Sequence, residues 1–474
     1  MARHGTQGRV RRQIQELFRG DVGGITGLLG AQQVQRAVQD QGVRFRDCLF
    51  TPWITLWTFL AQVLSPDGSC REAVAKLLAF VAANHGGVPE VQPDTGPYCK
   101  ARQRLPETLV AQLARDAGEQ LHRRHPTGQL LGGRAVKIVD GTTVSMPDTP
   151  ANQHDYPQPA PQKPGLGFPM ARLVAILSLN CAAVLALALG PYAGKQSGEL
   201  ALFRSLWDDP ASVLEAGDVL LGDRYYASYW TIAALLRRGV DGLFRQHQRR
   251  KSNFRTGLRL GKHDHLIVLR RPSQPPDWMD ARTFEQMPET LTVREVRIVV
   301  AQRGFRVRTL VLVTTLLDAQ VYSKQELALA FRQRWNVELD LRSIKQTMNM
   351  SVLRCKTPAM VRKEIWMHLL AYNLVRTVMA EAAQRAGIEP REVSFAGAVQ
   401  TINALGPLLI MAAADDAQAL MDVLLRAIAR HRVGDRPDRH EPRAVKRRAK
   451  PIALLTTPRP KARKRLEKRA TTKS

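Results

Sequence analysis

Cysteine is scarce in this chain, and the few cysteines present are far apart. Of 474 residues only five are cysteine, at positions 48, 70, 99, 181 and 355, and no two have the Cys-x2-Cys spacing typical of zinc sites. Secreted domains that depend on disulfides carry cysteine at much higher density. The sequence therefore excludes a disulfide framework and predicts a protein of the reducing cytoplasm.

Long hydrophobic runs are also missing. The start, MARHGTQGRVRRQ, is basic but has no apolar core segment, so no signal peptide is expected. The one candidate for a membrane span, Leu173–Leu189, has seventeen residues, fewer than the roughly 20 that cross a bilayer, and Asn180 interrupts it. Two strands at about 172–178 and 182–189, joined at Ser178–Cys181, explain this stretch better, so no membrane association is expected.

Aromatic residues and acidic residues are both in short supply. Aromatics amount to 6%, and neither an RRM nor a KH pattern is present, which disfavours an RNA-binding module. A Gly-x4-Gly-Lys-Ser/Thr loop is missing too, so no nucleotide cofactor is expected. The 42 Asp and Glu are outnumbered by 70 Lys and Arg, which gives a formal charge of +28 and favours a polyanionic partner over a merely basic soluble protein.

What the sequence does contain is an ordered set of charged side chains in FRQRWNVELDLRSIK. Arg334, Glu338 and Lys345 follow Phe331 by 3, 7 and 14 residues. At about 100° per helical residue, the four positions fall within a stripe roughly 60° wide on one helix. A carboxylate flanked by cations suits a site that holds a metal ion and a phosphate side by side. The alternative is a solvated charged face without function.

Two further acids follow short apolar runs. Asp140 ends the run Ala135–Val139 and is followed by Gly-Thr-Thr, and Asp223 ends Val219–Gly222. Both patterns predict a buried strand with an acid at its carboxyl end. Alone, each acid would be an ordinary turn-capping Asp. Together with Glu338, they form a set of three acids that is able to chelate two divalent metal ions.

These segments resemble the DDE transposases of bacterial insertion sequences. The closest group is the one with a Tyr-x2-Arg-x3-Glu-x6-Lys signature, whose spacing is met in full, although Phe331 stands where that group has Tyr. VDGTTV around Asp140 and GDRYYA around Asp223 also match. The similarity runs from roughly Arg44 to Arg465.

The resemblance implies a fold, a reaction and a set of site residues. The fold would be α/β, with a ribonuclease-H-like catalytic core, a β-rich insertion and helical regions at both ends. The reaction would be cleavage at the ends of an insertion sequence and strand transfer into target DNA. Asp140, Asp223 and Glu338 would be catalytic and would bind two Mg²⁺ ions, with Mn²⁺ able to substitute. The residues implied to contact DNA are Phe331, Arg334, Arg342 and Lys345.

Partners and alternatives follow from the same comparison. The family implies double-stranded DNA as partner, at terminal inverted repeats and target sites, and a homodimer on paired ends in a bacterial, nucleoid-associated setting. A catalytically inactive relative that still binds DNA is the main alternative. A basic RNA- or ribosome-associated protein with structural acids is another, and the intact set of three acids argues against both.

The order of predicted elements divides the chain into six parts. They are a helical N-terminal domain that binds DNA ends (1–130), the first part of the core (131–244), the β-rich insertion (245–320), the second part of the core (321–390), a helical C-terminal region (391–430) and a basic, largely disordered tail (431–474). The tail has sixteen Lys and Arg against four Asp and Glu, so we expect it to bind DNA, with an aid to solubility as the alternative.

Several local patterns refine these parts. Thr51 before Pro52 predicts the start of a helix that ends near Leu64. The capping box Ser323–Glu326 predicts another helix that continues to about Met348. On that helix Asp340 is turned about 200° from Glu338 and faces away from the site.

Two tryptophans are more difficult to assign. Trp335 is expected to anchor the core. Trp278, in a loop of the insertion, is expected to be packed as well, with base stacking as the less favoured alternative.

Overall fold

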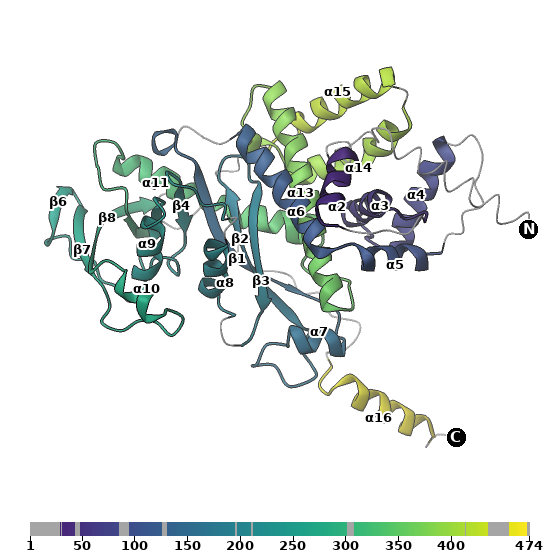
Figure 1. Cartoon of the computed structure of the whole chain (residues 1–474), viewed down its shortest axis with the longest axis horizontal. Helices are drawn as coiled ribbons and strands as arrows, with labels where there is room; N and C mark the ends of the chain where they lie inside the picture. The colour runs from purple at the N-terminus through teal and green to yellow at the C-terminus, as the bar shows by residue number, and fades with distance from the viewer. Residues whose placement is uncertain are drawn as a thin grey trace, which may run out of the picture.

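The protein is described from a computed structural model, which covers residues 29, 31–42, 48–84, 94–125, 130–194, 197–209, 212–300, 308–412, 414–434 and 455–471. These residues form a mixed α/β structure built on one sheet of nine strands (Figure 1). The strand order is β3-β2-β1-β4-β5-β9-β8-β7-β6. The strands are β1 (Val136–Ser145), β2 (Met170–Ser178), β3 (Val184–Pro191), β4 (Val219–Gly222), β5 (Asp241–Arg245), β6 (Leu258–Gly261), β7 (Asp264–Arg270), β8 (Thr290–Val300) and β9 (Arg308–Thr314).

Strand direction divides this sheet into two parts. β1, β4 and β5 run parallel to one another, and β2 and β3 extend the β1 edge as an antiparallel hairpin. The predicted hairpin of two strands is thus confirmed, and no described helix is long and apolar enough to cross a membrane. Its second strand starts at Val184 rather than 182, because Ala182 has a φ of 62° and belongs to the turn.

Helices cover the two faces of the sheet and create two hydrophobic cores. Successive residues of a strand point to opposite faces. Ile138 accordingly joins the core formed with α6 (Glu107–Arg124) and α13 (Pro358–Arg385), whereas Val139 joins the core formed with α8 (Glu199–Asp208) and α9 (Tyr229–Leu236). β1 is therefore buried on both sides and fixed in position.

The N-terminal helices share the first of these cores. They are α2 (Ala31–Asp40), α3 (Pro52–Leu64), α4 (Cys70–Asn84) and α5 (Gly96–Arg104). α3 begins as predicted: Thr51 Oγ1 accepts a hydrogen bond from the Ile54 amide, and Pro52 occupies the first turn. Because α3 and α13 pack in a common core, the described N-terminal helices are attached to the rest of the protein by apolar contacts.

The strand that carries Asp140 is longer than the sequence predicted. It continues from Asp140 through Gly141 and Thr142 to Ser145, paired throughout with β2. It pairs with β4 only over Val136–Ile138. Asp140 therefore lies in the middle of β1, just past the point where β1 and β4 separate. The expectation of a strand end was wrong because the two threonines that follow favour extended backbone and Gly141 adopts it here.

The β-rich insertion does not form a sheet of its own. The residue pattern also predicts a hairpin of strands at about 290–301 and 305–314, and this is confirmed, since Arg294–Val300 of β8 pairs with β9; its predicted turn at 302–304 lies outside the described residues. β9 pairs with β5, so the insertion extends the sheet that carries the acids. The remaining short helical elements of this part of the chain are α7 (Pro150–Asp155), α10 (Ala281–Glu285) and the 3₁₀ turn η2 (Leu131–Gly133).

The helix predicted from Ser323 to about Met348 is broken into three pieces. These are α11 (Lys324–Gln333), α12 (Asn336–Arg342) and the π-helical turn η3 (Ser343–Thr347). At the first break the amides of Arg334, Trp335 and Val337 bond to carbonyls three residues back instead of four, which tightens the turn. Ser323 caps α11 as expected, but the Glu326 carboxylate accepts a bond from the Leu131 amide, 2.6 Å away, rather than completing a capping box.

Helices also dominate the C-terminal part. η4 (Pro390–Glu392) leads to α14 (Phe395–Met411) and α15 (Ala414–Arg430), as predicted for 395–430. The tail differs from expectation, because Arg459–Thr471 forms the helix α16. Arg, Lys, Ala, Leu and Glu are good helix formers, and they outweighed the two prolines near its start.

Candidate active site

Asp140 lies on β1 and is partly buried, with 20% of its side chain exposed. Its Oδ1 accepts a hydrogen bond of 2.8 Å from the amide of Gly141. Burial raises its pKa to about 6, the Gly141 amide and Arg334 act against that rise, and the charges of Asp223 and Glu199 add to it. Asp140 is thus a partly buried carboxyl group whose pKa is affected by two other carboxylates, Asp223 and Glu199.

Asp223 stands directly after β4, the parallel neighbour of β1. Its Oδ1 accepts a bond of 2.7 Å from the amide of Tyr225, and its carbonyl accepts one from the amide of Tyr226. These bonds fix a tight turn at the end of β4, the strand paired with β1, and the charge of the half-buried Asp223 carboxylate contributes to the raised pKa of Asp140. The predicted pairing of the two strand acids is therefore present in the structure.

Glu338 is connected to Asp140 through Arg334, which pairs with both acids. One guanidinium nitrogen of Arg334 is 3.7 Å from Asp140 Oδ2, and another is 3.5 Å from Glu338 Oε1. The Arg334 side chain is only 10% exposed, whereas that of Glu338 is 64% exposed. A single buried cation thus links an acid on β1 to an acid on α12, and the two acids are almost 200 residues apart in sequence.

A hard divalent cation fits the chemistry of this site. Carboxylate oxygens are the ligands that Mg²⁺ prefers, and a bound cation would offset the effect of burial, which raises the pKa of Asp140. Among the described residues no three Asp, Glu, His or Cys side chains are already arranged as a metal site. The Arg334 guanidinium lies between Asp140 and Glu338 and neutralises part of their charge instead.

The predicted DNA-contacting residues occupy different environments. Arg342 is exposed, and its Nε donates to Gln346 at 2.8 Å. Lys345 is half-buried, and burial lowers its pKa. Phe331 is only 3% exposed and belongs to the large core, with Arg334 stacked 5.7 Å from its ring centre. The ring thus lies in the core against Arg334, whereas the sequence led us to expect a residue that contacts DNA.

The residues expected to be structural are structural. Asp340 is 1% exposed and forms ion pairs with Arg376 and Arg391, at 2.7 and 3.1 Å. Trp335 packs against the large core. Trp278 packs against the second core, and the Arg204 guanidinium stacks 4.1 Å from its ring centre.

Two residues near the acids were missed by the sequence analysis. Glu199 begins α8, and Tyr226 is the second tyrosine of GDRYYA. The charges of Asp140, Asp223 and Glu199 all act to raise the pKa of Tyr226, although burial is the main cause. The only sequence signal was an acid at the start of the helix that follows the hairpin, a position where acids are common for helix stability alone.

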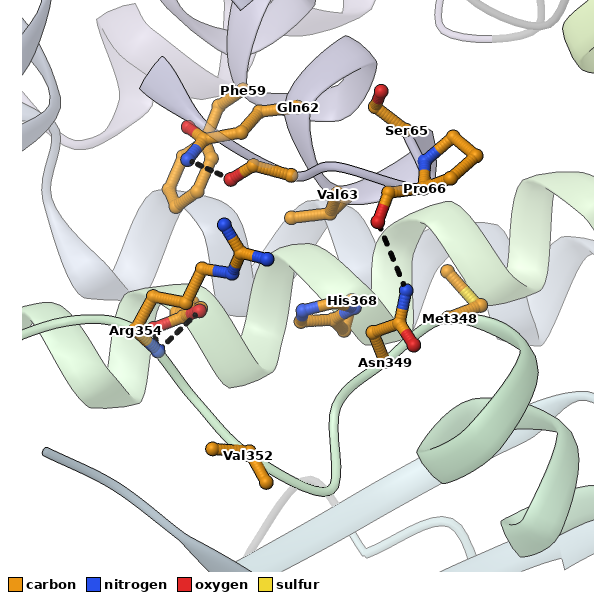
Figure 2. Close-up of a pocket in the computed structure, with 12 residues that line it drawn as sticks. Phe59, Gln62, Val63, Ser65, Pro66, Met348, Asn349, Val352, Arg354 and His368 are labelled. Carbon is orange, nitrogen blue, oxygen red and sulfur yellow. Dashed lines mark hydrogen bonds between the residues drawn. The ribbon is translucent and has the colours of Figure 1, made fainter. Parts of the chain in front are cut away.

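A pocket lies apart from these acids, between α3 and the segment after η3. Figure 2 shows Gln62 and Ser65 facing Asn349, Arg354 and His368 across it. Burial lowers the pKa of His368 to about 3, and its Nδ1 and the Ser65 hydroxyl are buried without a hydrogen-bond partner among the described residues. None of the predicted acids lines this pocket.

Comparison with known proteins agrees with the geometry of the acids. The family model for the transposase DDE domain matches residues 131–374, about half of the chain, and includes all three predicted acids. The chain belongs to the DDE transposase family. The transposase InsG for insertion sequence element IS4 of Escherichia coli (strain K12) is 27% identical over 374 residues, which cover 77% of this chain and 79% of InsG.

The resemblance predicted from the sequence is thereby confirmed. The protein is a DNA transposase, an enzyme whose substrate is DNA and whose family is in general dependent on divalent metal ions. A structural RNA-associated protein is excluded by this membership. The matched region begins at Leu131 and ends at Leu374, so it includes the whole of β1 to α12.

Proposed function

We propose that Asp140, Asp223 and Glu338 hold the two divalent cations of this transposase on a ribonuclease-H-like core. The observation that carries the proposal is the Arg334 guanidinium, paired with both Asp140 and Glu338. The strand order β3-β2-β1-β4-β5, with only β2 reversed relative to its neighbours β1 and β3, also supports such a core. All three acids stand on or next to neighbouring elements, since α12 packs on β1 and β4 pairs with β1.

The catalytic chemistry would be in-line displacement at a DNA phosphate. When bound, Mg²⁺ (or Mn²⁺) would activate the attacking water or 3′-hydroxyl and stabilise the leaving oxygen. Arg334, released from its pairs with Asp140 and Glu338, would then be free to bind a phosphate through two parallel hydrogen bonds. The Phe331 ring beneath it would keep the guanidinium in place.

Lys345 and Arg342 would contact the DNA backbone beside Arg334. Arg342 is exposed. Burial lowers the pKa of Lys345, and a phosphate close to the amine would raise that pKa again, because an anion favours the charged amine. The insertion adds exposed cations on β6 and in the segment before it, which include Arg249, Arg255 and Arg259. These side chains would increase affinity without reading sequence.

Hydrolysis would free the 3′-hydroxyl groups at the ends of the element, and each hydroxyl would then attack target DNA. This second step exchanges one phosphodiester for another, so it needs no nucleotide cofactor. Both ends must be cut together, and we therefore propose a homodimer bound to paired terminal inverted repeats. The catalytically inactive alternative has no observation in its favour, because the three acids and Arg334 are all present.

A nicking assay on terminal-repeat DNA tests the metal assignment. Glu338→Gln removes a ligand charge from an exposed side chain, so nicking and joining should be lost while DNA binding stays within a few-fold of wild type. Glu285→Gln, an exposed acid on α10, is the matched control and should be active. If Glu338→Gln nicks at the wild-type rate, the assignment of Glu338 is wrong.

Asp340 is a poor control for this experiment. The sequence placed it on the opposite face from Glu338, and the structure shows it buried with Arg376 and Arg391. Asp340→Asn would leave the guanidinium groups of Arg376 and Arg391 without the negative charge that they pair with. Loss of one partner of a buried ion pair costs about 3–5 kcal/mol. A loss of activity in this variant would report misfolding instead of a role in chemistry.

A further inference from the structure

Glu199 lies over the backbone of β1 next to Asp140. If Gly141 had a Cβ atom, that atom would be 2.6 Å from the Glu199 carboxyl carbon and 2.8 Å from its Oε1. Gly141 has ordinary strand geometry without a positive φ, so its backbone does not require glycine. A glycine inside a strand often marks the close approach of another group. Here the approaching group is the carboxylate of Glu199.

Tyr226 is buried beside the same acids. Its side chain is 0% exposed, and its hydroxyl has no hydrogen-bond partner among the described residues. The ring is held edge-on by Phe203, with 5.2 Å between ring centres. The charges of Glu199, Asp140 and Asp223 all act on this hydroxyl. A buried donor without an acceptor is unusual, and it indicates that a further polar group belongs at this place.

We propose that Glu199 is a fourth acid of the cation site and that Tyr226 hydrogen-bonds to the same group of ligands and water molecules. This inference rests on the proposed function. Glu199 is half-buried, and burial, with the charge of Asp223, raises its pKa, while Arg172 opposes the rise. Arg172 donates a hydrogen bond to the Ser197 carbonyl, and its charge acts on Glu199 from there.

The competing explanation is that Glu199 only stabilises α8. Acids are favoured in the first turn of a helix, where they interact with the helix dipole. That role needs no glycine at position 141 and no buried hydroxyl at Tyr226. It also predicts that Glu199 has no influence on metal binding, which separates the two explanations by experiment.

The test is the affinity of the full-length protein for Mn²⁺, measured by electron paramagnetic resonance in the presence of terminal-repeat DNA. Glu199→Gln should weaken Mn²⁺ binding by about 10-fold or more, in line with the effect of altered supporting groups at metal sites. Asp208→Asn, an exposed acid at the other end of α8, is the control and should bind Mn²⁺ as wild type does. The thermal midpoint in EDTA should not fall in either variant.

Two further variants approach the same question without changing Glu199. Gly141→Ala should displace the flexible Glu199 side chain, fold normally, and weaken Mn²⁺ binding about as much as Glu199→Gln. The two changes should not add in the double variant, because both remove one interaction. Tyr226→Phe should weaken Mn²⁺ binding by a smaller factor, about 2- to 10-fold, since it removes a single hydrogen bond.

Failure of this inference can be told from failure of the proposed function. Asp140→Asn must lose most Mn²⁺ affinity if the proposed cation site exists. If Asp140→Asn loses affinity while Glu199→Gln and Gly141→Ala bind Mn²⁺ normally, Glu199 is a helix-stabilising acid only. If all three bind normally, the proposed metal site itself is wrong.

Discussion

Replacing Asp140 with Asn should make the metal-free protein more stable. Asp140 is buried beside other acids, and this environment raises its pKa from 3.8 to about 6. Asn has almost the same shape and can still accept the hydrogen bond from the Gly141 amide, but it carries no charge. Keeping Asp140 ionised at neutral pH lowers the free energy of unfolding of the wild-type protein. The expected gain in Asp140→Asn is the size of this loss.

The size and the pH dependence of this gain follow from the pKa. Between pH 3.8 and about 6 the folded protein binds a proton at Asp140 that the unfolded chain does not bind. The contribution of Asp140 to the free energy of unfolding therefore falls as the pH rises through that range, and the loss is complete above pH 6. At about 1.4 kcal/mol per pH unit, the difference amounts to about 3 kcal/mol as an upper value.

The assay is thermal unfolding in EDTA and in Mg²⁺, at several pH values between 4 and 8. In EDTA at pH 7.5, Asp140→Asn should unfold a few degrees above wild type, and near pH 4 the two proteins should coincide. Mg²⁺ should stabilise wild type and leave Asp140→Asn unchanged. An Asp140→Asn protein less stable than wild type in EDTA at pH 7.5 would show that burial and the neighbouring acids do not disfavour the charge of Asp140, and the reasoning would be refuted.

Three other predictions use different readouts. Glu338→Gln should abolish nicking with Glu285→Gln active, and should change the thermal midpoint little, because Glu338 is largely exposed. Phe331→Tyr should lower the stability by about 1–3 kcal/mol in chemical denaturation, since a hydroxyl would enter the core without a partner; an unchanged stability would mean that the ring borders water. Deleting 435–474 removes fifteen Lys and Arg and keeps residues 431–434, whose backbone is hydrogen-bonded to Glu392 and Ser394. DNA affinity should fall, and its salt slope should become shallower by about 0.9 per lost phosphate contact; an unchanged slope would leave the tail with a solubility role.

Much of the fold could be predicted because local signals and tertiary packing agree. The cap at Thr51 and the hairpin around Asn180 appear where the sequence placed them, since each combines a turn or cap signal with an apolar run. The hairpin of the insertion was also found. Its continuity with the core sheet through β5 and β9 was not, because strand partners 70 residues apart leave no local trace.

The three acids of the proposed site came from sequence patterns, whereas their local geometry could not be predicted. Asp140 and Asp223 were found from strand patterns and Glu338 from its spacing, and the structure places the first two on neighbouring strands. The break at Arg334–Trp335 could not be seen, because these residues are compatible with a regular helix and the tightened turn depends on tertiary contacts. Glu199 and Tyr226 could not be assigned either, since only the folded chain brings them to Asp140.

The most direct test of the account is metal rescue of cysteine variants on terminal-repeat DNA. A cysteine thiolate is a poor ligand for Mg²⁺ but a better one for softer ions such as Mn²⁺. Asp223→Cys and Glu338→Cys should therefore bind DNA, fail to nick it with Mg²⁺ and regain nicking with Mn²⁺, whereas Glu285→Cys should nick with either ion. Nicking with Mg²⁺ by both site variants, at the wild-type rate, would contradict the claim that these carboxylates hold the catalytic cations.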